Sequence, residues 1–314
     1  MAVRTLDRSS VFTTSDGVRL HVSDTGPDAA PVTVVFLHGW TLDLATWDTV
    51  CGQLDEGLRL LRFDLRGHGR SQPAPPETAT IERCALDLAE LIDERVPTGP
   101  IVLAGHSMGA MTIMALAEGR ADLFAERIAG VALVATSGGG LGLSRATFGL
   151  PGPLGKASTS VQRGLQRWLA GNEHSRLLRD SRTMRPGVRW LLFGKRARRA
   201  DVAATAESLA CCHPRSMGQF RESLATHERL ERIEALRSVP TVVLAGLSDR
   251  LTPYPHARRL ARALPEAELL VHADAGHMLP LERGDAVAAR ISDLVRRVWP
   301  DESARAGTDL NDPT

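Results

Sequence analysis

The sequence lacks the features that would place it in several large protein classes. No run of about 18 consecutive apolar residues occurs, the length that would suggest a membrane-spanning helix. The N-terminal stretch has no apolar segment of the kind that a secretory signal carries. The chain has only four cysteines, and their spacing forms no disulfide framework. We therefore expect a cytoplasmic protein without a transmembrane segment.

Motifs for nucleotides and metals are also missing. No G-x-G-x-x-G or G-x-x-x-x-G-K-[ST] pattern follows any of the expected strands, so a nucleotide cofactor has no visible site. Cys211-Cys212-His213 brings three potential ligands together, but their spacing does not suit a tetrahedral zinc site and no second ligand cluster is near. We expect no cofactor, no metal and no nucleic-acid partner.

The charges that are present are distributed unevenly. The net charge of the chain is +1, yet the segment from Gly140 to Arg215 contains fourteen basic residues and only four acidic ones. That segment carries +10, so the rest of the chain carries −9. One interpretation is an ordinary solvated surface rich in arginine. The alternative is a surface that attracts an anionic or carrier-bound substrate.

Short apolar runs alternate with helical patterns along most of the chain, which is typical of a parallel sheet covered by helices on both faces. An opening hairpin turns at Asp16-Gly17. We expect an α/β fold with a mostly parallel sheet of about eight strands. The expected strands are 10–14, 18–23, 32–37, 59–63, 100–104, 131–135, 241–245 and 268–271, and the expected helices include 80–95, 108–118, 255–264 and 280–299.

The stretch 137–234 interrupts this alternation, since it contains helical patterns but no convincing strand. It is either a plain helical insertion or a lid over an active site, and the catalytic motifs on either side favour the lid. We expect a core formed by 1–136 and 235–299, with a helical cap over 137–234 inserted after the sixth strand. The polar stretch 300–314 predicts a disordered tail.

The sharpest chemical signal is Gly105-His106-Ser107-Met108-Gly109, between an expected strand and an expected helix. A serine in such a tight strand-to-helix turn takes a strained backbone conformation that exposes its hydroxyl, and the flanking glycines allow close packing. The motif by itself is weak, but in this context it predicts that Ser107 is a catalytic nucleophile.

A serine nucleophile needs a base, and the base needs an acid that orients it. His277 and Asp249 each lie just after an expected strand, so their loops open at the same edge of the sheet as Ser107. The chain order Ser107, Asp249, His277 is nucleophile, acid, base. The strand that ends at Ala135 is followed by no carboxylate, which leaves Asp249 as the preferred acid.

The remaining site residues follow from this placement. The backbone amides of Trp40, after the strand 32–37, and of Met108 are expected to form the oxyanion hole. Apolar residues of the cap are expected to line an acyl pocket together with the Trp40 side chain. The predicted substrate-binding residues are Trp40, Leu150, Trp168, Trp190, Phe193 and Phe220.

These motifs resemble the α/β-hydrolase fold family, in its capped esterase and lipase branch. The resemblance covers nearly the whole chain outside the cap and includes His38-Gly39-Trp40, the stretch Asp64–Ser71, the elbow at Ser107, and Gly276-His277 with Glu282. It implies that Asp64–Ser71 is a structural loop beside the site. It also implies a serine hydrolase that needs neither metal nor cofactor.

Departures from sister families narrow the activity. Epoxide hydrolases and haloalkane dehalogenases of this fold use an aspartate nucleophile, whereas this chain has Ser107. In C–C bond hydrolases the elbow usually resembles Asn-Ser-Met-Gly-Gly, whereas here His106 precedes the serine and Ala110 follows Gly109. The expected activity is carboxylesterase- or lipase-like hydrolysis of an ester with an apolar acyl group. An acyltransferase, thioesterase or lactonase with the same triad is the alternative, and a catalytically inactive binding protein is disfavoured by the intact triad.

Overall fold

The fold is built around one eight-stranded sheet with the strand order β1-β2-β4-β3-β5-β6-β7-β8. The computed structural model describes residues 7–141 and 180–300. The first hairpin and the β2–β4 pair are antiparallel, and the other neighbours are parallel. This confirms the predicted α/β class and the mostly parallel sheet of about eight strands. The strands are β1 Arg8–Thr13, β2 Arg19–Thr25, β3 Thr33–Leu37, β4 Arg59–Phe63, β5 Ile101–His106, β6 Ile128–Val134, β7 Thr241–Gly246 and β8 Glu268–His272.

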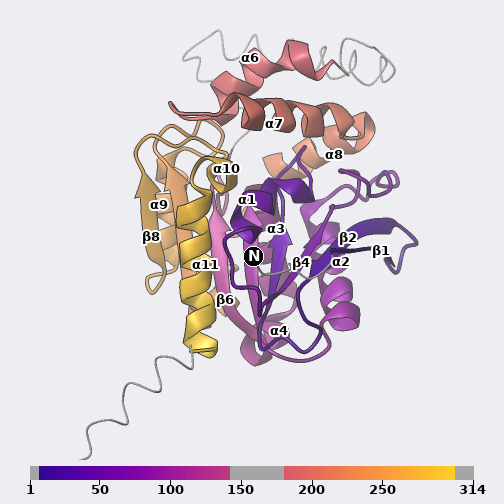
Figure 1. Cartoon of the computed structure of the whole chain (residues 1–314), viewed down its shortest axis with the longest axis vertical. Coiled ribbons are helices and arrows are strands. Elements are labelled where there is room, and N and C mark those ends of the chain that lie inside the picture. The colour runs from indigo at the N-terminus through magenta and orange to yellow at the C-terminus, as the bar shows by residue number, and fades with distance from the viewer. Residues whose placement is uncertain (1–6, 142–179, 301–314) are drawn as a thin grey trace, which may run out of the picture.

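Helices cover both faces of this sheet (Figure 1). Their described bounds are η1 Leu44–Trp47, α1 Asp48–Cys51, α2 Ile81–Arg95, α3 Met108–Gly119, α4 Ala121–Glu126, α6 Ser181–Leu192, α7 Arg199–Cys211, α8 Pro214–Ala225, η3 Glu234–Ser238, α9 Tyr254–Ala263, α10 Leu279–Glu282 and α11 Gly284–Val298. The predicted helix 280–299 is wrong in one respect. Arg283 has a φ of −142°, which is not helical, and it interrupts the helix so that α10 and α11 are separate.

The two faces of the sheet have separate apolar cores. Helices α2, α3 and α9 pack on one face, and α1 and α11 pack on the other. Strand β5 serves both cores, since Ile101 and Leu103 belong to the first and Val102 and Ala104 to the second. Burial on both faces explains why the strands are nearly uninterrupted apolar runs. Each fully buried valine, leucine or isoleucine side chain contributes about 1.5–3 kcal/mol to the stability of the fold by leaving water.

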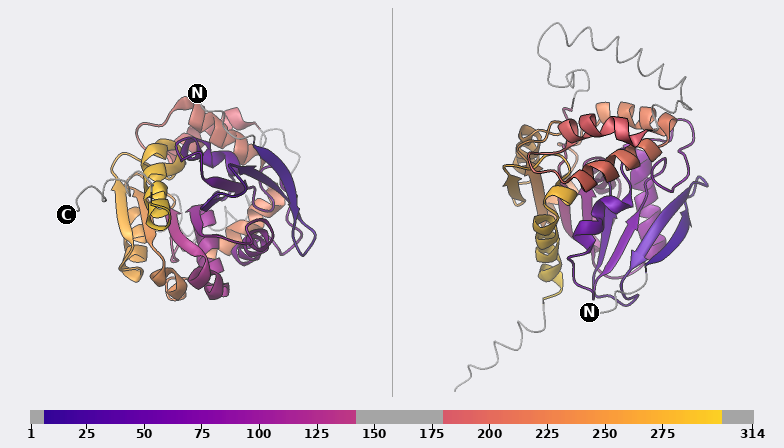
Figure 2. Two further views of the ribbon diagram at one scale, coloured as in Figure 1. Left: turned by 60° about the horizontal axis from the view of Figure 1, so that its bottom comes forward. Right: turned by 45° about the horizontal axis from the view of Figure 1, so that its top comes forward.

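Helices α6, α7 and α8 lie together over one end of the sheet (Figures 1 and 2). They follow β6 in the chain, as the predicted cap does, and their hydrogen bonds go to loops that follow core strands. Ser208 Oγ donates to Asp43 Oδ2 over 2.6 Å, and Ser216 Oγ accepts the amide of Ala74 over 3.1 Å. The part of the predicted cap over 142–179 and the predicted tail after Pro300 lie outside the described residues.

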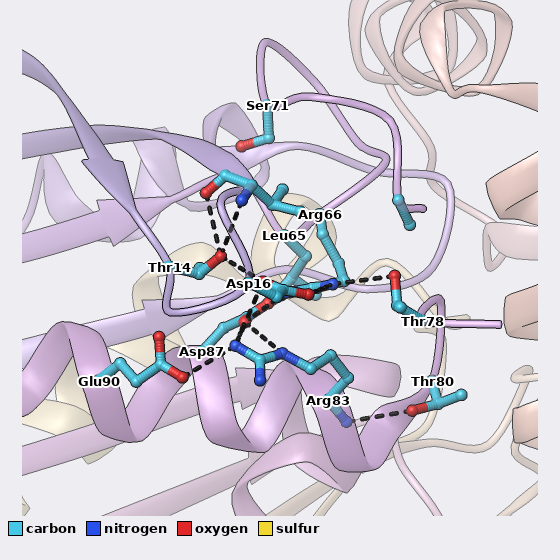
Figure 3. Close-up of polar contacts among 12 residues, drawn as sticks. Thr14, Asp16, Leu65, Arg66, Ser71, Thr78, Thr80, Arg83, Asp87 and Glu90 are labelled. Atoms are coloured by element: carbon cyan, nitrogen blue, oxygen red, sulfur yellow. Dashed lines mark hydrogen bonds and ion pairs between the residues drawn. The ribbon is translucent and has the colours of Figure 1, made fainter. Parts of the chain in front are cut away.

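The loop after β4 is held by a buried ion-pair network (Figure 3). The Arg66 side chain is fully buried and donates two hydrogen bonds to the Asp87 carboxylate, over 2.6 and 2.7 Å. It also donates to both oxygens of Asp16, and Arg83 pairs with Asp87 from the same helix. Burial raises the pKa of Asp87, whereas the hydrogen bonds from Arg66 hold the pKa of Asp16 below its usual range. The Arg66 guanidinium therefore fixes this loop to α2 and to the β1–β2 turn.

Other sequence-based expectations concern membranes and disulfides. Within 7–141 and 180–300, no helix is both long and apolar enough to cross a membrane. Cys51, Cys84, Cys211 and Cys212 all lie in the described ranges and form no disulfide there.

Candidate active site

Ser107 lies at the turn between β5 and α3, with backbone angles φ 52° and ψ −115°. A positive φ is unfavourable for a residue with a side chain, so the surrounding structure must enforce it. Gly105 and Gly109 make room, because a Cβ on Gly105 would lie 2.5 Å from the Ala110 nitrogen and one on Gly109 would overlap the carbonyl oxygen of Leu37. The strained strand–serine–helix turn expected from the sequence is therefore present.

Hydrogen bonds fix the main chain of Ser107. Its amide donates to the carbonyl of Val134 over 2.9 Å. Its carbonyl accepts the Thr136 hydroxyl over 2.9 Å and the Met111 amide over 3.1 Å. Strand β6 and the first turn of α3 thus hold the serine in place. Met108 follows at the first helical position, where a backbone amide has no partner within the helix.

His277 and Asp249 meet, although they lie on different loops. His277 Nδ1 and Asp249 Oδ2 are 2.8 Å apart, and both side chains are almost fully buried. A carboxylate in this position accepts the Nδ1 proton, which leaves the other ring nitrogen, Nε2, as the proton acceptor.

The surroundings of Asp249 keep it ionised. Its Oδ1 accepts the amides of Leu251 and Thr252 over 2.8 and 2.9 Å, and its Oδ2 accepts the Thr252 hydroxyl over 2.8 Å. Burial by itself would raise the pKa of Asp249, but the neighbouring His277 and these hydrogen bonds outweigh it and lower the pKa below 3.8. Thr252 was missed by the sequence reasoning, because a hydroxyl three residues after an acid is too common to stand out.

His106 links the serine turn to the histidine loop. Its Nε2 donates to the main-chain carbonyl of His277 over 2.8 Å, and the two rings lie 4.9 Å apart. Burial lowers the pKa of His106 to about 3, so this ring is neutral. The residue before Ser107 therefore sets the position of the loop that carries His277. A histidine in the elbow motif was visible in the sequence, but its partner 171 residues away was not.

The loop after β3 lies against the serine turn. A Cβ added to Gly39 would be 3.2 Å from the Cβ of Ser107 and 2.8 Å from His106 Nδ1. His38 anchors this loop, since its Nδ1 donates to the Gly39 carbonyl over 2.8 Å and its Nε2 accepts the Leu65 amide over 2.9 Å. Burial lowers the pKa of His38, which keeps the ring in this neutral form.

Trp40 follows Gly39 in that loop. Its side chain is partly buried against the core, and within the described ranges its buried indole N–H has no hydrogen-bond partner. The next residue, Thr41, has a φ of 65°. The chain therefore turns at Thr41, just after the loop passes beside Ser107 at Gly39.

Among the described residues, Ser107 Oγ and His277 form no hydrogen bond with each other. Both belong to loops joined by His106, and in ligand-free enzymes the contact between nucleophile and base is often long and tightens when substrate binds. The structure thus brings together the acid and the base directly, and the serine turn and the base through His106.

The predicted pocket residues have different surroundings. Phe193 is buried in a small apolar cluster with Leu42, which lies in the loop after β3, and with Met278, which follows His277. Trp190 is 50% exposed, and the Arg250 guanidinium lies 5.2 Å from its ring centroid. Phe220 has no exposed surface and packs in the core on one face of the sheet, 5.1 Å from the ring of His68. Leu150 and Trp168 lie outside the described residues.

The Cys211-Cys212-His213 cluster lies where α7 ends and α8 begins. Cys211 is exposed at the end of α7, whereas Cys212 is buried with its Sγ 3.6 Å from the Gly67 carbonyl. Burial raises the pKa of Cys212 to about 12, which leaves it a protonated thiol. In the parts of the chain that the structure describes, no group of three or more His, Cys, Asp or Glu side chains is arranged to hold a metal ion.

A cleft of about 360 Å³ lies elsewhere, between β2, α1 and β4. None of its lining residues belongs to the loops that carry Ser107, Asp249 or His277, so it is separate from the candidate active site. It is lined by Thr25, Gly26, Asp48, Cys51, Leu54, Asp55, Glu56, Leu58, Leu60 and Arg62.

Comparison with known proteins agrees with this architecture. The chain matches the alpha/beta hydrolase family over residues 34–290 and belongs to that family. The fold and the site thus define a hydrolase.

Particular relatives are consistent with this class. The chain is 29% identical to the pimeloyl-[acyl-carrier protein] methyl ester esterase of Aromatoleum aromaticum, over 84% of this chain and 98% of that one. It is also 29% identical to the dihydrolipoyllysine-residue acetyltransferase component of the acetoin cleaving system of Cupriavidus necator, over 87% and 66%. The structure of a thermophilic esterase from Thermogutta terrifontis superposes with a TM-score of 0.70 at 27% identity, covering 93% of this chain and 99% of that one.

Proposed function

We propose that this protein is a serine esterase that hydrolyses a carboxylic ester with an apolar acyl group. The observation that carries the proposal is the strained Ser107 turn, joined through His106 to a loop whose His277 is already hydrogen-bonded to Asp249. Esterases among the relatives and the structural neighbours support the same class of reaction.

The proposed reaction has two steps. His277 Nε2 takes the proton of the Ser107 hydroxyl as its oxygen attacks the ester carbonyl, and then returns the proton to the leaving alcohol. Asp249 stays ionised and holds the imidazole in the productive tautomer. Water then attacks the acyl-enzyme with His277 again as base, which releases the acid and regenerates the serine.

The proposed oxyanion hole consists of the amides of Met108 and Trp40. Met108 lies at the first position of α3, where its amide has no partner within the helix and where the helix dipole also favours negative charge. At Gly39 the loop after β3 lies against Ser107, which supports the amide of the next residue, Trp40, as the second donor. One such donor is typically worth about 2.7–4 kcal/mol of transition-state stabilisation. For the acyl pocket we propose Phe193 and Trp40 as lining residues. Phe193 packs with Met278, which follows His277, and this supports its place in the pocket. Trp40 packs partly buried against the core.

The test is hydrolysis of p-nitrophenyl esters of increasing chain length by the wild type and by Ser107→Ala. We expect activity that disappears in the variant, and labelling of the wild type but not of the variant by an organophosphonate. The chain length that gives the highest activity would indicate the size of the acyl pocket. Full activity in Ser107→Ala would refute the serine mechanism.

A second candidate is a transferase, thioesterase or lactonase that acts on an anionic or carrier-bound acyl group. The observation in its favour is the basic stretch Lys195–Arg199, which begins where the amide of Lys195 donates to the carbonyl of Asp274, three residues before His277. The relatives named for an acyl-carrier protein ester and for an acetyltransferase agree with such a substrate. Positive charge here would attract an acidic carrier.

Salt dependence separates the two candidates. Turnover of an anionic or carrier-bound substrate should fall steeply between low and physiological salt, whereas turnover of a neutral short ester should not. Equal salt sensitivity for both substrates would contradict a role of the basic cap. If the protein labels with a phosphonate but hydrolyses no simple ester, the transferase or specialised-pathway alternative is favoured.

A further inference from the structure

The Glu282 carboxylate joins two segments that are far apart in the sequence. Its Oε1 accepts the amide of Gly276 over 2.9 Å, and its Oε2 accepts the amide of Gly194 over 2.7 Å. Gly276 directly precedes His277, and Gly194 belongs to the cap segment that follows α6. One carboxylate on α10 therefore satisfies a donor on each segment.

The same two segments are joined by main-chain hydrogen bonds. The carbonyl of Leu192 accepts the amides of His277 and Met278 over 2.7 and 3.2 Å, and the carbonyl of Asp274 accepts the amide of Lys195 over 3.0 Å. We call the set formed by 192–195, 274–278 and Glu282 the cap–loop contact.

The cap–loop contact is close because two glycines meet in it. A Cβ on Gly276 would lie 2.5 Å from the nitrogen of Gly194, and a Cβ on Gly194 would overlap the carbonyl oxygen of Asp274. Such an approach leaves no room for a side chain on either segment. Phe193 fixes the cap side further, since its buried ring packs with Met278 and Leu42.

His277 is consequently held through its main chain from two directions. Its amide donates to Leu192 in the cap segment, and its carbonyl accepts from His106 beside the serine. Its ring is held separately by Asp249. The position of Nε2 relative to Ser107 therefore depends on the cap segment as well as on the core.

We propose that Glu282 is a positioning residue for the base: by bridging Gly276 and Gly194, it makes the cap segment 192–195 and the histidine loop one rigid unit and holds His277 at its working distance from Ser107. The hydrogen bonds of the Glu282 carboxylate go to the main-chain amides of Gly276 and Gly194, so it acts on His277 through the backbone. The inference rests on the proposed esterase function, because ester turnover is one of its readouts.

The geometry suits a carboxylate. Two amide donors from different segments each meet a separate oxygen, and a carboxylate places an acceptor at both positions. A glutamine has one acceptor, and its NH2 group would face the second amide as another donor. An alanine leaves both amides without this partner.

The experiment compares Glu282→Ala, Glu282→Gln and a matched control, Glu90→Ala. Glu90 also joins two distant segments through its carboxylate, accepting the amide and hydroxyl of Ser15 over 2.7 and 2.6 Å, but it lies on α2 beside the β1–β2 turn (Figure 3). The readouts are kcat and KM for a p-nitrophenyl ester, the rate of Ser107 labelling by a phosphonate, and amide hydrogen exchange of the full-length protein.

We expect Glu282→Ala to lower kcat about ten- to hundredfold and to leave KM nearly unchanged, because a small displacement of a catalytic group has costs of this size. Exchange should become faster in the peptides that cover 192–195 and 274–278. Glu282→Gln should fall between the wild type and Glu282→Ala. Glu90→Ala should keep kcat and the exchange of these peptides at the wild-type values.

Several results would overturn the inference. Faster exchange with unchanged kcat would mean that the bridge does not position the base, and a lower kcat with unchanged exchange would mean that Glu282 acts in some other way. A rise in KM with constant kcat would also contradict it. If the wild type hydrolyses no ester, the proposed substrate class fails, and the labelling rate then decides about Glu282. If the wild type does not label either, both proposals fail together.

Discussion

Replacing Asp249 by asparagine tests the proposed mechanism most directly, because the change keeps the size of the side chain and alters only its donors and acceptors. Oδ1 accepts two backbone amides, from Leu251 and Thr252, so the single oxygen of an asparagine would occupy that position. The new NH2 group would then take the place of Oδ2, which faces His277 Nδ1 at 2.8 Å. Donor would meet donor unless the ring changes its tautomer.

The magnitude follows from that tautomer. With the asparagine NH2 donating to Nδ1, the His277 proton must reside on Nε2, the nitrogen that should take the proton of Ser107. In a comparable Ser-His-Asp enzyme such an exchange lowers kcat about 10⁴-fold, or about 5 kcal/mol of activation free energy. We expect a loss of the same order in Asp249→Asn.

The assay measures kcat of Asp249→Asn on a p-nitrophenyl ester, with Asp285→Asn as the matched control at an exposed position on α11. Thermal unfolding checks that both variants are folded. A nuclear magnetic resonance spectrum should lose the low-field proton signal of His277 Nδ1–H in Asp249→Asn. The control should keep both the signal and the activity.

The pH dependence provides a second check on Asp249. Its pKa in the folded state is lowered from 3.8, so its contribution to stability is present above that value and is lost as the pH falls toward the folded-state pKa. Titration of Asp249 should therefore not limit activity near neutral pH. If Asp249→Asn is folded and keeps more than about a tenth of the wild-type kcat, a deficit of less than about 1.4 kcal/mol, Asp249 is not the orienting acid and the reasoning is refuted.

Three further predictions concern the glycine beside the serine turn, the Arg66 ion pair and the buried histidines. Gly39→Ala should lower kcat up to about a hundredfold, because the added methyl group would press on the serine turn and displace a proposed oxyanion donor; steady-state kinetics test this. Asp87→Ala should lower the free energy of unfolding by about 3 kcal/mol, measured in urea, because Arg66 would lose its bidentate partner while fully buried. Burial lowers the pKa of His68 and of His106 from 6.5 to about 3. Below pH 6.5 the unfolded chain therefore binds protons at these two histidines while the folded protein does not, and the free energy of unfolding should fall. His68→Gln should reduce the slope of unfolding free energy against pH by about 1.1 kcal/mol per pH unit on average between pH 6.5 and 5, because the unfolded histidine is only half protonated at pH 6.5.

Controls for these predictions lie elsewhere on the same chain. Gly119→Ala adds a methyl group into open space at the end of α3 and should leave kcat unchanged. Arg120→Ala breaks two surface ion pairs, with Asp93 and Asp122, and should destabilise the fold far less than Asp87→Ala. Equal effects in either comparison would contradict the packing and burial arguments. An unchanged pH slope in His68→Gln would show that this histidine is not kept neutral by the fold.

The sequence was sufficient for the fold class and for the catalytic candidates. Uninterrupted apolar runs predict parallel strands covered on both faces, and the central strands β3, β5, β6 and β7 lie at such runs because burial on both faces is the physical cause of that pattern. The candidates Ser107, Asp249 and His277 each follow a strand, and parallel strands bring such loops to one edge of the sheet. The break between α10 and α11 was missed although Gly284 directly follows Arg283, because a single glycine within a helical pattern does not by itself end a helix.

The tertiary structure alone decided what supports these residues. The His106 link to the His277 carbonyl and the bridge of Glu282 between Gly276 and Gly194 join positions far apart along the chain, and no periodicity or local motif encodes such a pairing. Phe220 illustrates the same limit, since an apolar side chain in the cap can face a pocket or the core and only the packing of α8 settles it. Sequence patterns report local geometry and burial, whereas the partner of a buried polar group is fixed only when distant segments pack.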